Sequence, residues 1–249
     1  MHLVIDYGNT RTKVAVFSPT GQQQRQYMWE KPTLDNYACI LNEYAIDAVI
    51  VCSVAAIPDG LLHLLHQRVA YVLVLDHSTP LPMQNGYKTP QTLGYDRLAV
   101  AVGANALHPN TPVLIIDAGT AITYDFVSPD NVYQGGNIAP GAAMRFSALH
   151  HFTHKLPHLS LPDEEVTDLL GDSTKNAIQL GIVKGIVFEM EGYIAHLKEK
   201  YPQLLIFLTG GDAFFFERRV KSSIFVSPNL LLVGLHRILT YNQCLQNAR

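Results

Sequence analysis

The sequence has few cysteines, no excess of positive charge and no long hydrophobic run. Its three cysteines, Cys39, Cys52 and Cys244, are scattered and odd in number, which indicates a reducing, cytoplasmic setting rather than a disulfide framework. A formal net charge of −3 gives no basic patch for nucleic acid. The apolar runs are far shorter than the roughly 18 residues of a membrane-spanning helix, and the opening residues do not resemble a signal peptide. We therefore expect neither nucleic acid nor a membrane as a partner.

Apolar material is plentiful, since 48% of the 249 residues are hydrophobic, enough for one large core or two ordinary ones. Short apolar runs bounded by turn residues predict strands in the first half, with two helices that Thr33 and Asp59 would cap. The first half thus has the order β-β-β-α-β-α-β, followed by a loop over 76–95 and a helix over 97–107. In the second half we expect strands at 113–117, 122–127, up to 138 and at 204–208, with helices near 142–151, 173–200, 213–220 and 229–241.

The opening pattern of the chain returns in its second half. The strand that ends in Asp117 and Gly119 repeats the strand that ends in Asp6 and Gly8, and the two aspartates are 111 residues apart. In both halves a Ser-Pro turn then separates the second strand from the third. This internal repeat predicts an α/β protein of two related lobes, residues 1–111 and 112–249, with a cleft between them.

The turn after the first strand suits phosphate binding. A strand that stops at Asp6 and turns back through Gly8 exposes backbone N–H groups with little side-chain bulk. These groups, the side chains of Asn9 and Thr10 and the charge of Lys13 suit phosphate oxygens, and Asp6 would face a phosphate-bound Mg²⁺. A single such turn could equally be a plain hairpin. Two copies, each at the end of a buried strand, favour a pair of turns that bind the phosphates of ATP.

Other segments carry weaker signals. The pair Gly210-Gly211 follows a strand, where nucleotides dock in open α/β sheets, and an adenosine contact is one interpretation. Asp96 could simply cap the helix that begins at Arg97, or the two could form the acceptor site of a kinase, in which a carboxylate orients and deprotonates a hydroxyl. The histidines at 150, 151, 154 and 158 include i, i+4 pairs, but a solvated or substrate-lining segment is favoured over a metal site there.

Taken together, these segments resemble the type III pantothenate kinases, which lie within the superfamily of acetate and sugar kinases, Hsp70 and actin. The resemblance covers nearly the whole chain, and its matching pieces occur in family order: 6–13, Pro90, Gly94, Asp96-Arg97, Asp117, Gly119-Thr120-Ala121, Gly135-Gly136, Ile138, Pro140-Gly141, Ser173-Thr174 and 209–211. It implies two ribonuclease-H-like lobes that clasp ATP. It also implies transfer of the ATP γ-phosphate to the primary hydroxyl of pantothenate, the first step of coenzyme A biosynthesis.

The resemblance also implies roles for single residues. ATP would bind at Asp6, Tyr7, Gly8, Asn9, Thr10, Arg11, Thr12, Lys13 and Thr120, with Mg²⁺ near Asp6. Pantothenate would lie near Tyr87, Gly94, Tyr95, Asp96, Arg97 and Thr174, with Asp96 as proton acceptor and Thr174 supplied by the other subunit of a homodimer. Asp117 matches a position that binds a monovalent cation, K⁺ or NH₄⁺. Tyr7 departs from the small aliphatic residue more usual in the family, which could change the packing below the turn.

Two other functions stay open on sequence alone. One is a related small-molecule kinase with another acceptor, such as a sugar or a carboxylic acid. The other is a non-catalytic accessory regulator of the same fold, which would show no acceptor-dependent ATP turnover. The acceptor segment 94–97 and the lack of a basic DNA-binding segment argue against the regulator.

Overall fold

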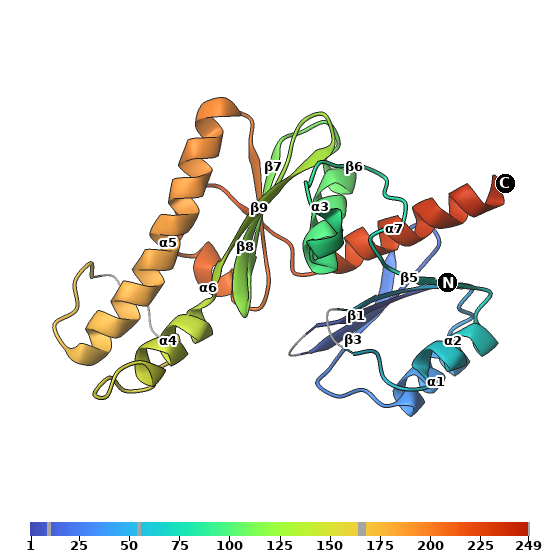
Figure 1. Ribbon diagram of the computed structural model, residues 1–249, viewed down its shortest axis with the longest axis horizontal. Coiled ribbons are helices and arrows are strands. Elements are labelled where there is room, and N and C mark those ends of the chain that lie inside the picture. Colours follow the sequence, from blue (N-terminus) through green and yellow to red (C-terminus); the bar gives the residue numbers. More distant parts are fainter. Residues whose placement is uncertain (9–10, 54–55, 164–167, 249) are drawn as a thin grey trace. The chain divides into compact units, whose positions relative to one another are not determined.

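The computed structural model describes residues 1–8, 11–53, 56–163 and 168–248, which fall into two compact units (Figure 1). The first unit contains the chain up to Asn110, a short piece over Asp130–Gln134, and the C-terminal segment from Asn229 onward. The second contains Thr111–Pro129 and Gly135–Pro228. The C-terminal helix thus belongs by its contacts to the first unit, whereas the predicted lobes grouped it with the second half. The lobe bounds and the ATP cleft remain predictions.

The sheet of the first unit has five strands in the order β3-β2-β1-β4-β5. Strand β1 is antiparallel to β2 and parallel to β4, β2 is antiparallel to β3, and β4 is parallel to β5. The predicted order β-β-β-α-β-α-β is confirmed by these elements: β1 His2–Tyr7, β2 Thr12–Phe17, β3 Gln23–Trp29, α1 Leu34–Glu43, β4 Ala48–Ser53, α2 Leu61–Arg68 and β5 Tyr71–Val74.

Helices α1 and α2 pack against one face of this sheet. Leu3 and Ile5 of β1 share a fully buried core with Tyr37 of α1 and Leu61 of α2. Thr33 occupies the N-cap of α1 as predicted. The predicted cap of α2 was wrong: Gly60, with φ of 81°, takes that position in place of Asp59, because the chain enters the helix through a left-handed conformation that glycine adopts at little cost.

Helices α3 (Tyr95–Leu107) and α7 (Leu230–Asn247) pack on each other and against the strands of the same unit. Two glycines allow their backbones to approach closely. A Cβ on Gly103 would lie 2.4 Å from the carbonyl oxygen of Leu230, and one on Gly234 would lie 1.8 Å from that of Ala99. This close packing holds α3 against α7.

The second unit repeats the plan of the first. The six-stranded sheet has the order β11-β10-β7-β8-β9-β6, in which β9-β8-β7-β10-β11 corresponds to β3-β2-β1-β4-β5. Strand β7 is antiparallel to β8 and parallel to β10, and β10 is parallel to β11, as in the first copy. Strand β6 Gln84–Asn85 and the 3₁₀ turn η1 Pro90–Thr92 belong to the first unit. The remaining elements are β7 Val113–Ala118, β8 Ala121–Val127, β9 Val132–Pro140, α4 Ala142–His151, α5 Thr174–Lys200, β10 Leu205–Thr209, α6 Ala213–Glu217 and β11 Phe225–Val226.

Helices α4, α5 and α6 of the second unit share one core with the strands (Figure 1). Its fully buried centre joins Ile116 of β7 and Tyr124 of β8 to Ile186 and Met190 of α5. Ser173 caps α5 by accepting the backbone N–H of Asn176 at 3.3 Å. In the described parts of the chain no helix is long and apolar enough to cross a membrane.

Candidate functional site

The first predicted phosphate turn closes the hairpin between β1 and β2. The N–H of Gly8 donates to the carbonyl oxygen of Arg11 at 3.2 Å. A Cβ on Gly8 would lie 2.9 Å from that same oxygen, so the turn has no room for a side chain there. The predicted phosphate ligands Asn9 and Thr10 lie outside the described residues.

The side chain of Tyr7 points away from Asp6, into the core under α1. It is buried and its hydroxyl is hydrogen-bonded to that of Tyr37, whose ring meets Trp29 edge-on. Thr12 pairs with Tyr7 in the β1–β2 ladder and is also buried. Because successive residues of a strand alternate between faces, Tyr7 and Thr12 can offer a phosphate only their backbone. The large side chain at position 7 is thus accommodated by a tyrosine pair.

Asp6 lies in a row of side chains that crosses three strands. It pairs with Lys13 on β2 and with Cys52 on β4. Residues paired in this way point to the same face of the sheet, so the three side chains are neighbours. Asp6 is 5% exposed and Cys52 is fully buried, while Lys13 is half-buried. The row therefore places a carboxylate, a thiol and an ammonium group next to the turn.

Asp96 reaches the same row from the first turn of α3. Burial raises the pKa of the Cys52 thiol well above its ordinary value, and the charges of Asp6 and Asp96 raise it further, as does a hydrogen bond with Asp6. Both carboxylates therefore lie close enough to one buried thiol to act on it. Both aspartates were predicted from the sequence, but Cys52 was not, because its only signal is its place near the end of a buried strand.

The position of the Asp96 carboxylate depends on Gly94. Gly94 is the N-cap of α3, so the alternative in which Asp96 caps the helix is wrong. A Cβ on Gly94 would lie 2.5 Å from Oδ1 of Asp96, and that oxygen accepts the backbone N–H of Arg97 at 2.9 Å. The carboxylate is thus folded back over the start of the helix, where the exposed N–H groups favour negative charge.

Arg97 joins the predicted acceptor residues from the next position of α3. Its side chain is 6% exposed and its guanidinium lies over the ring of Tyr87, 5.8 Å from the centroid. The ring of Tyr87 is 6.1 Å from that of Tyr133, centroid to centroid. Tyr87 and residues 94–97, all predicted to bind the acceptor, are therefore gathered in the first unit, with Tyr95 half-buried beside Asp96.

The second predicted phosphate turn joins β7 to β8 and is one residue shorter than the first. Here Gly119 donates to the carbonyl oxygen of Ala121 at 3.0 Å, and Thr120 is exposed at the tip. Gly141, the N-cap of α4, lies directly on this turn: its Cβ would be 2.1 Å from the carbonyl oxygen of Gly119. The predicted glycine segment before α4 is thus in contact with the second turn.

Asp117 occupies in the second unit the place that Asp6 has in the first. It pairs with Thr123 on β8 and Thr209 on β10. Gly210, at φ of 95°, passes so close that its Cβ would lie 2.5 Å from Oδ1 of Asp117. Asp117, the second turn and the glycine pair therefore meet at the carboxyl ends of β7 and β10, where ligands bind in open α/β sheets.

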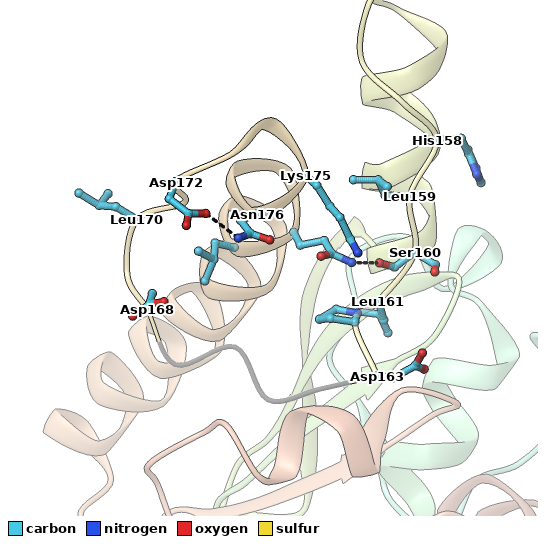
Figure 2. A pocket seen from close by; sticks show the side chains of 13 residues that line it. His158, Leu159, Ser160, Leu161, Asp163, Asp168, Leu170, Asp172, Lys175 and Asn176 are labelled. Atoms are coloured by element: carbon cyan, nitrogen blue, oxygen red, sulfur yellow. Dashed lines mark hydrogen bonds between the residues drawn. The ribbon is translucent and has the colours of Figure 1, made fainter.

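Two hollows open near these residues in the second unit. The larger, of about 650 Å³, lies between the start of α5 and the segment 158–163 (Figure 2). There Asn176 donates to Asp172 at 2.6 Å and Gln179 donates to the carbonyl oxygen of Ser160 at 3.0 Å. Thr174 is exposed as the first residue of α5. The smaller hollow, of about 260 Å³, is lined by Phe146, Leu161 and Asp212 among others, and burial raises the pKa of Asp212.

The histidine segment after α4 makes local contacts. His150 Nδ1 is 2.9 Å from the carbonyl oxygen of Leu156, and its ring meets that of His158 edge-on at 5.5 Å. His158 also lines both hollows. Among the described residues no group of three or more His, Cys, Asp or Glu side chains is placed to hold a metal ion.

Comparison with known proteins identifies the family. The family model of type III pantothenate kinases matches residues 2–196. The chain is 46% identical over 242 residues to the type III pantothenate kinase of Phocaeicola vulgatus, covering 97% of this chain and 99% of that protein. It is 47% identical over 242 residues to that of Bacteroides fragilis, with 97% and 98% covered. The chain belongs to the type III pantothenate kinase family.

Solved structures bear out the fold of this type III pantothenate kinase. A Campylobacter jejuni chain assigned to the Baf family of transcriptional activators matches with a TM-score of 0.61 at 20% identity, covering 97% of this chain and 99% of that one. The activator of 2-hydroxyisocaproyl-CoA dehydratase from Clostridium difficile, solved with bound ADPNP, matches with a TM-score of 0.54 at 13% identity, covering 99% and 96%. At these identities the likeness concerns the fold alone. The predicted α/β fold of two related lobes is confirmed.

Proposed function

We propose that residues 94–97 hold pantothenate and that Asp96 accepts the proton of its primary hydroxyl as the γ-phosphate of ATP is transferred. As a member of its family the chain is an ATP-dependent pantothenate kinase, which fits the first step of coenzyme A biosynthesis. The observation that carries the role of Asp96 is that its charge and that of Asp6 both act on the thiol of Cys52. A base and a phosphate-binding turn are thereby neighbours in one unit.

The proposed chemistry rests on positioning. In a loose phosphoryl transfer the attacking hydroxyl must be in line with the leaving oxygen, and its proton leaves late. Asp96 would orient the hydroxyl and take that proton. Arg97 keeps its charge at every relevant pH and has donors for the carboxylate of pantothenate. The ring of Tyr87 limits where that guanidinium can move.

We further propose that each turn binds phosphate oxygens of ATP, the first through residues 6–13 and the second through Thr120. Mg²⁺ would supply charge neutralisation of the phosphates. Its preference for one or two carboxylates beside phosphate oxygens suits the buried carboxylate of Asp6. Asp117 would bind K⁺ or NH₄⁺, since its carboxylate and the carbonyl oxygen of Ala118 both lie against Gly210. The cytoplasmic location predicted from the cysteines suits these partners.

The homodimer is proposed on the outer face of α5. Gly181, Gly185 and Gly192 follow one another at intervals of four and seven residues, and a Cβ on any of them would meet nothing within 4 Å. Phe188 stands between them, 58% exposed. Each glycine inside a helix costs roughly 0.5–1 kcal/mol, a cost that a second helix packed on this face would offset. Thr174 begins the same helix, so a partner bound here would bring its own Thr174 with it.

The decisive experiment replaces Asp96 by Asn, which keeps the shape of the side chain and removes the base. We expect kcat for phosphopantothenate formation to fall roughly 10²-fold or more, while ATP still binds. Asp59→Asn, an exposed aspartate of the same unit, is the matched control and should leave kcat unchanged. Wild-type turnover in Asp96→Asn would rule out this role.

The other functions left open by the sequence are tested in the same assay. ADP release is followed with pantothenate, with sugars and with carboxylic acids as acceptors, with and without K⁺. Turnover that depends on pantothenate alone supports the proposal. Turnover with another acceptor would favour a related kinase, and no acceptor-dependent turnover would favour the accessory regulator.

A further inference from the structure

The buried thiol of Cys52 lies near the two carboxylates to which the proposed mechanism gives roles. Cys52 is paired with Asp6 in the parallel ladder of β1 and β4, fully buried, and hydrogen-bonded to the Asp6 carboxylate. The Asp96 carboxylate is near enough for its charge to act on the same thiol. A change at Cys52 therefore acts on both groups without touching a substrate.

The second unit has a hydrogen-bonding group at the same place. Thr209 of β10 is paired with Asp117 as Cys52 of β4 is paired with Asp6, and it is 2% exposed. In both repeats, a small side chain with one hydrogen-bond donor, a thiol or a hydroxyl, lies beside the aspartate near the end of the first strand. An aliphatic residue would fill the same space, so packing alone does not explain a thiol in one copy and a hydroxyl in the other.

We propose that Cys52 is a positioning residue whose S–H donates to the Asp6 carboxylate and holds it in the orientation that receives Mg²⁺ and the phosphates. The inference rests on the proposed role of Asp6. A thiol ordinarily has a pKa of about 8.5 and is protonated near neutral pH, so Cys52 acts as a donor and adds no third negative charge. An ionised group at this position would repel both carboxylates.

The test compares Cys52→Thr with Cys52→Val, two side chains of nearly equal shape that differ in one hydroxyl. The readout is the binding of a non-hydrolysable ATP analogue, measured by titration calorimetry with and without Mg²⁺. In the valine variant we expect Mg²⁺ to improve binding roughly five- to tenfold less than in the wild type, because a hydrogen bond to a charged group is lost. The threonine variant should keep the wild-type ratio within about twofold, and the KM for pantothenate should change in neither.

A second pair, Cys52→Ser and Cys52→Ala, repeats the comparison with side chains no larger than the thiol. Cys39→Ala, at an exposed cysteine of the same unit, is the control and should leave the ratio unchanged. Equal Mg²⁺ effects in the two members of each pair would overturn the proposal. A failure of the proposed role of Asp6 itself would look different. In that case Asp6→Asn would leave the improvement of ATP-analogue binding by Mg²⁺ unchanged.

Discussion

Gly94 is the residue on which the geometry of Asp96 depends most directly. Its φ of −61° and ψ of 131° are open to any residue, so alanine there would not strain the backbone. The obstacle is Oδ1 of Asp96, 2.5 Å from where the new Cβ would be. Gly94 therefore matters because it leaves space for the Asp96 carboxylate, and not because the backbone conformation requires a glycine.

Gly94→Ala should accordingly lower kcat while leaving the fold intact. We expect a decrease of roughly 10- to 100-fold, the scale of a misplacement of about 1 Å in a reacting group. Steady-state kinetics with pantothenate gives kcat, and thermal unfolding with ATP-analogue binding serves as the control for folding and for the nucleotide site. An unchanged kcat would mean that the carboxylate has room to move without loss.

Functional residues could be predicted from the sequence where a local pattern of strand and turn residues marks them. Asp6, Asp117 and Gly8 follow from a strand that ends in a glycine turn, and the repeat identifies them twice. That Asp6 and Asp96 face one thiol could not be predicted, because it depends on how α3 packs on α7 through Gly103 and on which face of β4 carries Cys52. Such long-range packing has no periodic signature in one sequence.

At the scale of elements, β1 and α7 meet through two buried histidines. Nδ1 of His2 is 2.9 Å from Nε2 of His236, and the ring of His236 also stacks on Phe17 at 4.6 Å. Burial, together with the charges of His2 and Arg237, lowers the pKa of His236 to about 4. Burial also lowers the pKa of His2, against the opposing effect of Asp47. Both rings are therefore neutral in the folded protein near pH 7.

This pair should make the protein less stable in mild acid. Because the folded pKa of His236 lies below the unfolded value of about 6.5, the unfolded chain binds more protons between pH 6.5 and pH 4, and stability falls as pH falls through that window. Between pH 7 and pH 5 the loss from His236 is roughly 2 kcal/mol. Urea unfolding at both pH values measures it. His236→Gln should flatten the dependence and the exposed His77→Gln should not; equal slopes in all three proteins would contradict the assignment.

Most elements were predicted by their apolar periodicity and turn residues, and the exceptions have physical reasons. Strand β11 has only two residues, too few for an alternating pattern. The N-cap of α2 is a glycine in a left-handed conformation, which no side-chain rule for caps selects. Helix α3 begins at Tyr95, whereas the sequence predicted a start at Arg97. The N-cap is Gly94, and a glycine at this point of the sequence is equally typical of the preceding loop.

At the scale of the whole molecule, the proposed dimer is open to a direct test. Phe188→Glu places a charge in the middle of the glycine face of α5, where burial against a second copy would be costly. We expect sedimentation analysis to show a dimer for the wild type and a monomer for the variant, with a raised KM for pantothenate because Thr174 of the partner is lost. Leu107→Glu, at an exposed leucine of α3, is the control. A monomeric wild type would exclude the dimer, and a dimeric Phe188→Glu would exclude this face.

The return of α7 to the first unit has a consequence for synthesis. The sheet face that carries His2, Asp6 and Cys52 is covered by α7, which packs against β1, β2 and β4. Because α7 begins at Leu230, it is synthesised long after these strands. The first unit, although most of it is made first, therefore cannot close until α7 has been synthesised. A nascent or truncated chain that ends before Asn229 leaves this face and the Gly103 side of α3 exposed. Quality-control proteases should therefore degrade such chains faster than chains that contain α7.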